Sequence, residues 1–321
     1  MAAEVALSHP TETPRSARFD GVFKYATWFF AVAILLIMGA IIVSLAASSA
    51  PAIGQFGLGF LVSTAWDPVK ENFGALPSIY GTLLTSFFAM LIGIPVALGV
   101  ALYITELCPR WLKRPIGTMI ELLAAIPSII YGIWGLFVFA PWFQSTIEPW
   151  LIDALGDIPG IGLLFSGPPL GIGYFTAGLI LAIMVLPFMA SVTRDVFETV
   201  PAVLKESAYG IGATTTEVMW NVVLPTTRVG VIGGIMLGLG RALGETMAVT
   251  FVIGNAHRLN FSILAPGTSI SATLANEFAE ATTVLYRSSQ FYMGLILFVI
   301  TFIVLAIAKT MLIRMQRKAG G

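Results

Sequence analysis

The chain has 321 residues, of which 57% are hydrophobic and 11% are charged, and its 17 basic and 17 acidic side chains give a formal net charge of zero. Together with a mean hydropathy of +0.90, this composition excludes an ordinary soluble globular protein. The balanced charge gives no indication of a nucleic-acid partner. We therefore expect an integral membrane protein that contacts lipid.

Six long apolar stretches follow one another along the chain. A bilayer core about 30 Å thick is crossed by roughly 20 apolar residues in a helix. The stretches do not alternate between apolar and polar residues as barrel strands would, so the expected fold is all-α, with six transmembrane helices. The predicted spans cover residues 27–47, 80–105, 116–140, 171–193, 228–254 and 288–308.

Lysine and arginine residues are concentrated in every second connection between the predicted spans. They precede the first span, follow the second, flank the connection between the fourth and fifth, and close the chain, whereas residues 141–170 contain none. Because cytoplasmic connections carry an excess of Lys and Arg, these basic regions and both termini are predicted to be cytoplasmic.

Prolines occur inside three of the predicted spans, at Pro95, Pro127 and Pro187. A proline removes a helical hydrogen bond and bends the helix axis, so we expect bent helices here. Ser128, which follows Pro127, would offer a hydroxyl group to a polar pathway.

The connection 196–227 predicts two short helices. Thr199 is the predicted cap of the first helix, and Gly212 permits a turn after it. Thr214 and Glu217 have the spacing of a capping box, which predicts the start of a second helix. Two helices held between membrane spans would form a rigid projection that transmits a push as a rigid-body motion.

The same connection carries the pattern Glu-x-Ala-x3-Gly-x9-aliphatic-x-Leu-Pro. This pattern resembles the EAA loop of bacterial ABC importer permeases, with a serine in place of the central alanine, and the second short helix is expected to stop before its proline. The resemblance implies a type I ABC importer (MetI-like) permease fold, in which this loop docks on a separate ATPase. The residues implied in ATPase coupling are Glu206, Ser207, Ala208, Gly212, Ala213, Leu224 and Pro225.

The fifth predicted span carries both small and charged residues. Gly234 and Gly238 have the small-xxx-small spacing that lets another helix approach closely. Arg241 lies near the middle of the span, where an unpaired charge costs at least about 2.5–3.5 kcal/mol, and Glu245 would follow on the same helix face. Two interpretations stay open: an ion pair that an arriving oxyanion displaces, because its oxygens suit the guanidinium fork, or a permanent structural pair.

Three segments within the spans are similar to the PstC-type permease subunits of bacterial phosphate ABC transporters: residues 80–86 (YGTLLTS), 125–132 (AIPSIIYG) and 239–249 (LGRALGETMAV). The similarity covers roughly residues 20–314. It implies a multi-pass subunit of the bacterial cytoplasmic (inner) membrane that moves inorganic phosphate. It also implies a heterodimer with a PstA-type permease, two copies of a cytoplasmic ABC ATPase, and an extracytoplasmic phosphate-binding protein.

With this resemblance the predicted organisation has four parts. They are a cytoplasmic N-terminal tail (1–26), a first transmembrane helix with its periplasmic loop (27–75), an ABC importer transmembrane domain containing the coupling loop 196–227 (76–314), and a cytoplasmic C-terminal tail (315–321).

The sequence has no motif of a nucleotide or metal site. There is no Gly-Lys dipeptide and hence no phosphate-binding GxxxxGK[ST] loop, so ATP and Mg²⁺ are expected only at the partner ATPase. The single cysteine, Cys108, and two histidines predicted on opposite sides of the membrane, His9 and His257, have no metal-ligand spacing. We therefore expect a transporter subunit that is not itself an enzyme and binds no cofactor.

The resemblance gives Arg241 and Glu245 a role in phosphate passage, and the hydroxyl of Ser128 beside Pro127 makes Ser128 a further candidate for the pathway. Two alternatives stay open. The substrate could be another oxyanion, such as sulfate, molybdate or phosphonate, because one arginine does not separate tetrahedral anions. An ion-coupled secondary transporter or channel is the other alternative, but it leaves the coupling loop unexplained.

Overall fold

The computed structural model describes residues 14–319, and side chains from residue 20 to residue 314. The predicted tails therefore lie partly outside the described residues. By packing, the chain divides into two units, residues 1–48 and residues 49–321. Helix α1 (Pro14–Phe56) covers the predicted first span and extends beyond it on both sides.

The second unit is built on four long helices: α3 (Leu76–Leu102), α7 (Tyr174–Glu198), α10 (Leu224–Leu243) and α13 (Val284–Ala319). The shorter elements are α2 (Gly59–Val62), β1 (Trp66–Asp67), β2 (Asn72–Phe73), η1 (Tyr103–Leu107), α4 (Arg110–Ala124), α5 (Ser128–Trp134), η2 (Gly135–Phe139), α6 (Ala140–Leu155), η3 (Gly162–Phe165), α8 (Ala202–Gly210), α9 (Thr215–Val218), η4 (Met219–Val223), α11 (Met247–Val252) and α12 (Ile270–Glu277). Strands β1 and β2 form a small antiparallel hairpin that pairs Trp66 with Phe73.

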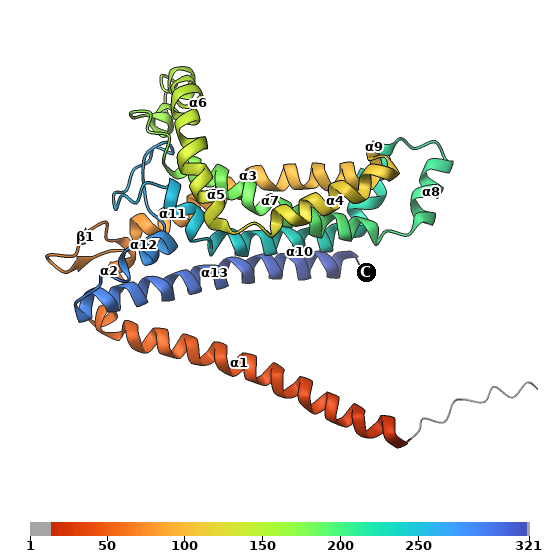
Figure 1. The fold of residues 1–321 in the computed structure, drawn as a ribbon, viewed down its shortest axis with the longest axis horizontal. Coiled ribbons are helices and arrows are strands. Elements are labelled where there is room, and N and C mark those ends of the chain that lie inside the picture. Colours follow the sequence, from red (N-terminus) through yellow and green to blue (C-terminus); the bar gives the residue numbers. More distant parts are fainter. Residues whose placement is uncertain (1–13, 320–321) are drawn as a thin grey trace, which may run out of the picture. The chain divides into compact units, whose positions relative to one another are not determined.

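The long helices of this unit run side by side, α4 packs along α7, and other short elements lie at the two ends of the long helices (Figure 1). One end carries α8 and α9; the other carries α11, α12 and the β1–β2 hairpin. These are called the α8 end and the α12 end below.

The predicted membrane architecture is confirmed. Among the described residues, five helices are long and apolar enough to cross a membrane, and a bent pair of helices is a sixth candidate. That pair is the predicted third span: α4 ends at Ala124, the chain resumes as a helix at Ser128, and the two axes differ by 87°. Pro127 lies at the break, directly before α5. Proline has no amide hydrogen to donate, so it is favoured at a helix break and disfavoured inside a helix.

The predicted fifth span, 228–254, is wrong in extent. The helix runs from Thr215 to Leu243, and the next one, α11, begins only at Met247. Between them the Glu245 carboxylate accepts a hydrogen bond from the Ala248 amide at 3.2 Å. Such a local side-chain to backbone bond after a glycine competes with the regular helical pattern, which explains the interruption.

Small residues set the spacing of the central helices. A Cβ atom on Gly234 would lie 3.0 Å from the Val192 side chain of α7, and one on Gly238 would lie 2.6 Å from Met189. The predicted close approach at these two glycines is therefore confirmed, and its partner is α7. Helix α3 also packs against α7 and contributes Ala89 and Ala97 to the same buried core.

Large apolar side chains point away from this core. Leu83, Phe87 and Leu91 on α3, and Phe298 and Phe302 on α13, are exposed in the isolated chain. An exposed apolar face of this extent on a long apolar helix is suited to contact with lipid or with another membrane helix.

Candidate functional site

The connection 196–227 folds as a compact projection at the α8 end. Helix α8 is followed by a tight turn at Gly212, which has φ of +89°, a left-handed conformation that glycine adopts without strain. The Ala213 amide donates to the Ala208 carbonyl at 3.1 Å and closes the turn. The predicted turn is therefore present.

The predicted capping box is also present. The Thr214 amide donates to the Glu217 carboxylate at 2.8 Å, and the Glu217 amide donates to the Thr214 hydroxyl at 3.4 Å. The first predicted cap is wrong, because Thr199 lies at the C-terminal end of α7 and Pro201 is the residue that precedes α8.

The second helix of the projection does not stop before Pro225. Helix α9 continues through the π-helical turn η4 into α10, so that the helical path is unbroken from Thr215 to Leu243. Pro225 is tolerated because it lies in the first turn of α10, directly after the π-helical turn. The projection is thus the beginning of a membrane helix.

Two contacts fix α8 to the rest of the unit. Ala208 and Leu224 pack against a buried cluster that contains Phe197 and Met219. Lys205 of α8 forms an ion pair with Glu106 of η1, at the end of α3, and only 19% and 9% of these two side chains are exposed. The projection is therefore joined to α3 as well as to α10.

The outward face of α8 is open. Glu206 and Ser207 are exposed, and the Ser207 hydroxyl donates to the Val203 carbonyl within the helix. Large apolar side chains lie beside them: Val203 is 69% exposed and Ile211 is 88% exposed. A tip with this composition is suited to entering a cleft on another protein.

The structure separates Arg241 from Glu245. Arg241 is exposed in the last turn of α10, whereas Glu245 is half-buried in the break after it. The expectation of a shared helix face is wrong, because α10 ends at Leu243, and the ion pairs among the described residues do not include these two.

The two interrupted spans pack against each other just beyond their breaks. Gly132 of α5 lies so close to α11 that a Cβ atom there would be 3.0 Å from the Ala248 Cα. Ser128, at the start of α5, is half-buried near this junction, and the Tyr131 hydroxyl donates to the Leu123 carbonyl at 2.9 Å. Tyr131 was missed by sequence reasoning, although it lies within the family-like segment 125–132 and carries a polar group beside two helix breaks.

A second constellation, at the α12 end, has no sequence signature. The Glu277 carboxylate accepts hydrogen bonds from Trp66 Nε1 and the Tyr286 hydroxyl, both at 2.7 Å, and its other oxygen lies 2.5 Å from His257 Nε2. The Trp66 and His257 rings also stack, with centroids 4.7 Å apart. Burial raises the pKa of Glu277, but the hydrogen bonds from His257, Tyr286 and Trp66 outweigh it, so the net pKa is lowered.

Apolar spans with interrupted helices and a rigid projection between the fourth and fifth spans define a permease, the membrane component of a transport system. A model of the family described as "Binding-protein-dependent transport system inner membrane component" matches residues 89–317, and the chain belongs to this family. As predicted, it is the inner membrane component of its transport system rather than the ATPase. The chain is 57% identical to the phosphate transport system permease protein PstC of Mesorhizobium japonicum, over 98% of this chain and 97% of that relative.

Solved structures share the fold. A chain of a bacterial alginate ABC transporter, in complex with alginate pentasaccharide-bound periplasmic protein, has a TM-score of 0.61 at 17% identity, covering 92% of this chain and 96% of that chain. A chain of the MetNI methionine ABC transporter in an inward-facing conformation has a TM-score of 0.50 at 18% identity, covering 75% and 94%. The predicted type I, MetI-like fold is confirmed.

Proposed function

We propose that this chain is the permease subunit of an ATP-driven importer of inorganic phosphate in a bacterial inner membrane. The observation that carries the mechanism is the α8 projection, a rigid element with an exposed tip that is continuous with a membrane helix. The choice of phosphate rests on the 57% identity to a phosphate transport permease over nearly the full length.

A separate ATPase would supply the energy. Two copies of a cytoplasmic ABC ATPase would bind ATP and Mg²⁺, and one of them would receive the exposed tip formed by Val203, Glu206, Ser207 and Ile211. The buried contacts of Ala208 and the Lys205–Glu106 pair would carry the resulting displacement to α3 and α10.

The other proposed partners are a PstA-type permease, which would form a heterodimer with this chain, and an extracytoplasmic phosphate-binding protein. We place the α8 end and both termini in the cytoplasm. The orientation is supported by basic residues at this end of the unit. Lys113 and Arg114 of α4 line a cavity with Glu198, the last residue of α7, and Lys309 of α13 lies near Gly230 in the first part of α10.

Arg241, Glu245 and Ser128 would line the substrate pathway where the two interrupted spans meet. Because Arg241 has no ion pair among the described residues, an arriving phosphate would bind its guanidinium without first displacing a carboxylate. Glu245, which holds the start of α11, would keep the break in shape. In this proposal Arg241 acts as an exposed cation beside a helix break, and neither a displaceable nor a permanent ion pair with Glu245 is required.

The test is uptake of labelled phosphate at low external phosphate in cells that lack the gene for this chain. Wild type should restore uptake, excess sulfate, molybdate or phosphonate should leave it unchanged, and Arg241→Gln should abolish it while the protein still inserts. Arg228→Gln, an arginine near the opposite end of α10, is the matched control and should transport. Uptake at the wild-type rate by Arg241→Gln would contradict the role of Arg241.

Two other outcomes would change the function. If excess of one competing anion abolished the uptake of labelled phosphate, that oxyanion would be favoured as the substrate. Uptake that persists without the ATPase would favour an ion-coupled secondary transporter or channel.

A further inference from the structure

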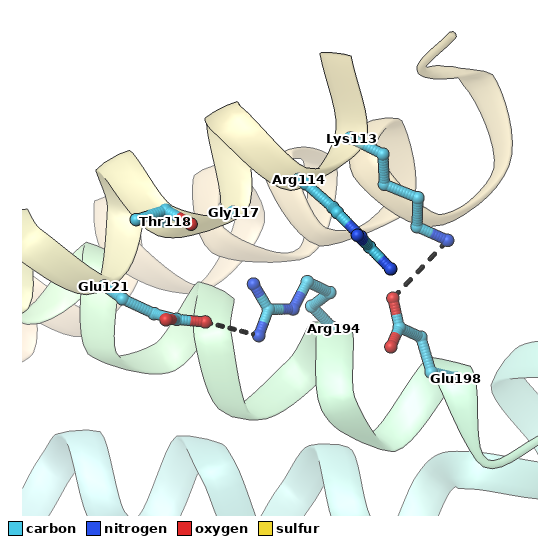
Figure 2. A pocket seen from close by; sticks show the side chains of 7 residues that line it. All are labelled: Lys113, Arg114, Gly117, Thr118, Glu121, Arg194 and Glu198. Carbon is cyan, nitrogen blue, oxygen red and sulfur yellow. Dashed lines mark hydrogen bonds and ion pairs between the residues drawn. The ribbon is translucent and has the colours of Figure 1, made fainter. Parts of the chain in front are cut away.

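A charged cavity of about 390 Å³ lies between α4 and α7, near the α8 end (Figure 2). Three basic side chains, Lys113, Arg114 and Arg194, line it together with two acidic ones, Glu121 and Glu198. None of these residues belongs to the proposed substrate pathway or to the projection, so the cavity is distinct from both.

Arg194 is held in place from one side only. Its Nη2 atom lies 2.7 Å from both Glu121 and Asp195, and its Nε donates to Asp195 at 3.1 Å. The remaining nitrogen, Nη1, makes no hydrogen bond among the described residues. It lies against Gly117, where a Cβ atom would be 2.6 Å away. Glycine at this position therefore keeps a fixed guanidinium edge free for another acceptor.

The other two cations come from α4. Lys113 Nζ lies 3.4 Å from the Glu198 carboxylate. Arg114 is exposed and takes part in no hydrogen bond or ion pair among the described residues. Figure 2 shows the Arg114 and Arg194 side chains in the space between the two helices, with the Arg194 guanidinium turned toward Glu121 and the Arg114 guanidinium turned toward Glu198. Lys113 and Arg194 are thus paired with Glu198, Glu121 and Asp195, whereas Arg114 forms no ion pair among the described residues.

We propose that this cavity binds a phosphate group. Planar guanidinium groups with free N–H donors match phosphate oxygens, and Lys113 would add a point charge. The exposed Thr118 hydroxyl, which also lines the cavity, would supply a further donor. The group is either the headgroup phosphate of an anionic lipid or free inorganic phosphate.

The surroundings of the cavity suit both sources. Helix α4 exposes Trp111, Met119 and Leu122 in addition to its basic residues, the composition of a helix at a membrane surface. Basic pockets between helices on the cytoplasmic side attract anionic headgroups, and phosphate carried inward would arrive on that same side. The site does not depend on phosphate being the transported ion.

The test uses the full-length chain in the Arg241→Gln background, so that binding at the proposed pathway does not contribute. For free phosphate, thermal unfolding of the purified protein is titrated with inorganic phosphate at constant ionic strength. For lipid, native mass spectrometry measures the phosphatidylglycerol retained from bilayer discs of phosphatidylglycerol and phosphatidylcholine.

Three further variants decide the outcome. Arg114→Gln removes the unmatched charge and should weaken binding of the true ligand about tenfold. Gly117→Ala should also weaken it, because the new methyl group displaces Arg194 Nη1. Arg110→Gln is the matched control, an exposed arginine of α4 outside the cavity, and should bind as the parent does.

Each result has one meaning. A loss confined to the phosphate titration supports a free-anion site, and a loss confined to retained phosphatidylglycerol supports a headgroup site. The proposal is overturned if Arg114→Gln binds both probes as the parent does, or if Arg110→Gln loses as much as Arg114→Gln.

Discussion

The two ends of the second unit are held together by different chemistry. At the α12 end, Trp66, His257 and Tyr286 converge on the single carboxylate of Glu277, and the Trp66 ring packs against both other rings. At the α8 end, separate ion pairs each join two elements, as Lys205 does with Glu106 and Lys113 does with Glu198.

This difference indicates where the molecule tolerates motion. The Glu277 carboxylate accepts hydrogen bonds from several elements at once. If one of these elements moved away, its buried donor would lose its acceptor, so we expect the elements at the α12 end to move together as a rigid body. Long flexible side chains in pairs let two helices shift while the charges stay close. The α8 end is therefore the end suited to movement.

The largest expected effect comes from removing the shared carboxylate. Glu277→Ala leaves the donors of Trp66 and Tyr286 and the His257 ring without their acceptor, and should lower the free energy of unfolding by about 3–5 kcal/mol. Denaturant unfolding of the purified protein in detergent measures it. Glu280→Ala, an exposed carboxylate three residues on, is the control and should change stability by less than about 0.5 kcal/mol. If the two substitutions lowered the free energy of unfolding equally, the proposed role of Glu277 in holding the α12 end together would be contradicted.

The next effect is at the α8 end. Lys205→Met leaves Glu106 mostly buried without its partner and should lower stability by about 2–3 kcal/mol. In the assembled transporter we also expect more ATP hydrolysed per phosphate moved, because α8 is then less firmly joined to α3. The exchange Lys205→Glu with Glu106→Lys restores the pair and should recover both quantities. An exchange variant as impaired as Lys205→Met would show that the pair does not position α8.

A pH titration sharpens the comparison. The folded-state pKa of Glu277 is lowered below its ordinary value of 4.5, so its contribution to stability is present above that value and is lost as pH falls through the folded-state pKa. The stability difference between wild type and Glu277→Gln should therefore shrink below about pH 4.5. A constant difference across that range would mean that the Glu277 charge does not hold the α12 end.

The smallest effect tests the start of α9. Thr214→Ala removes the hydroxyl that accepts from the Glu217 amide and should lower stability by about 1 kcal/mol. Thr216→Ala, an exposed threonine inside the same helix, is the matched control. If both substitutions have the same effect, the capping box contributes nothing specific.

Sequence reasoning succeeded where the signal is local. Runs of apolar residues predicted the spans, and the spacing of Thr214 and Glu217 predicted the capping box that the structure contains. It failed at Gly244–Glu245–Thr246, because the surrounding residues are apolar enough to hide a break of three residues. It also missed the Glu277 constellation and the Lys205–Glu106 pair, whose members are far apart in the chain and meet only through the fold.

The continuity of the helix from Thr215 to Leu243 has a mechanical consequence. At 1.5 Å per residue, its 29 residues form a lever about 43 Å long, with the docking projection at one end and Arg241 near the other. Tilting such a rod by roughly 5° about one end displaces the other by about 4 Å, somewhat less than the ~5.4 Å pitch of one helical turn. In the function proposed above, a small movement of the ATPase would thus displace the Arg241 end of this helix without any local unfolding.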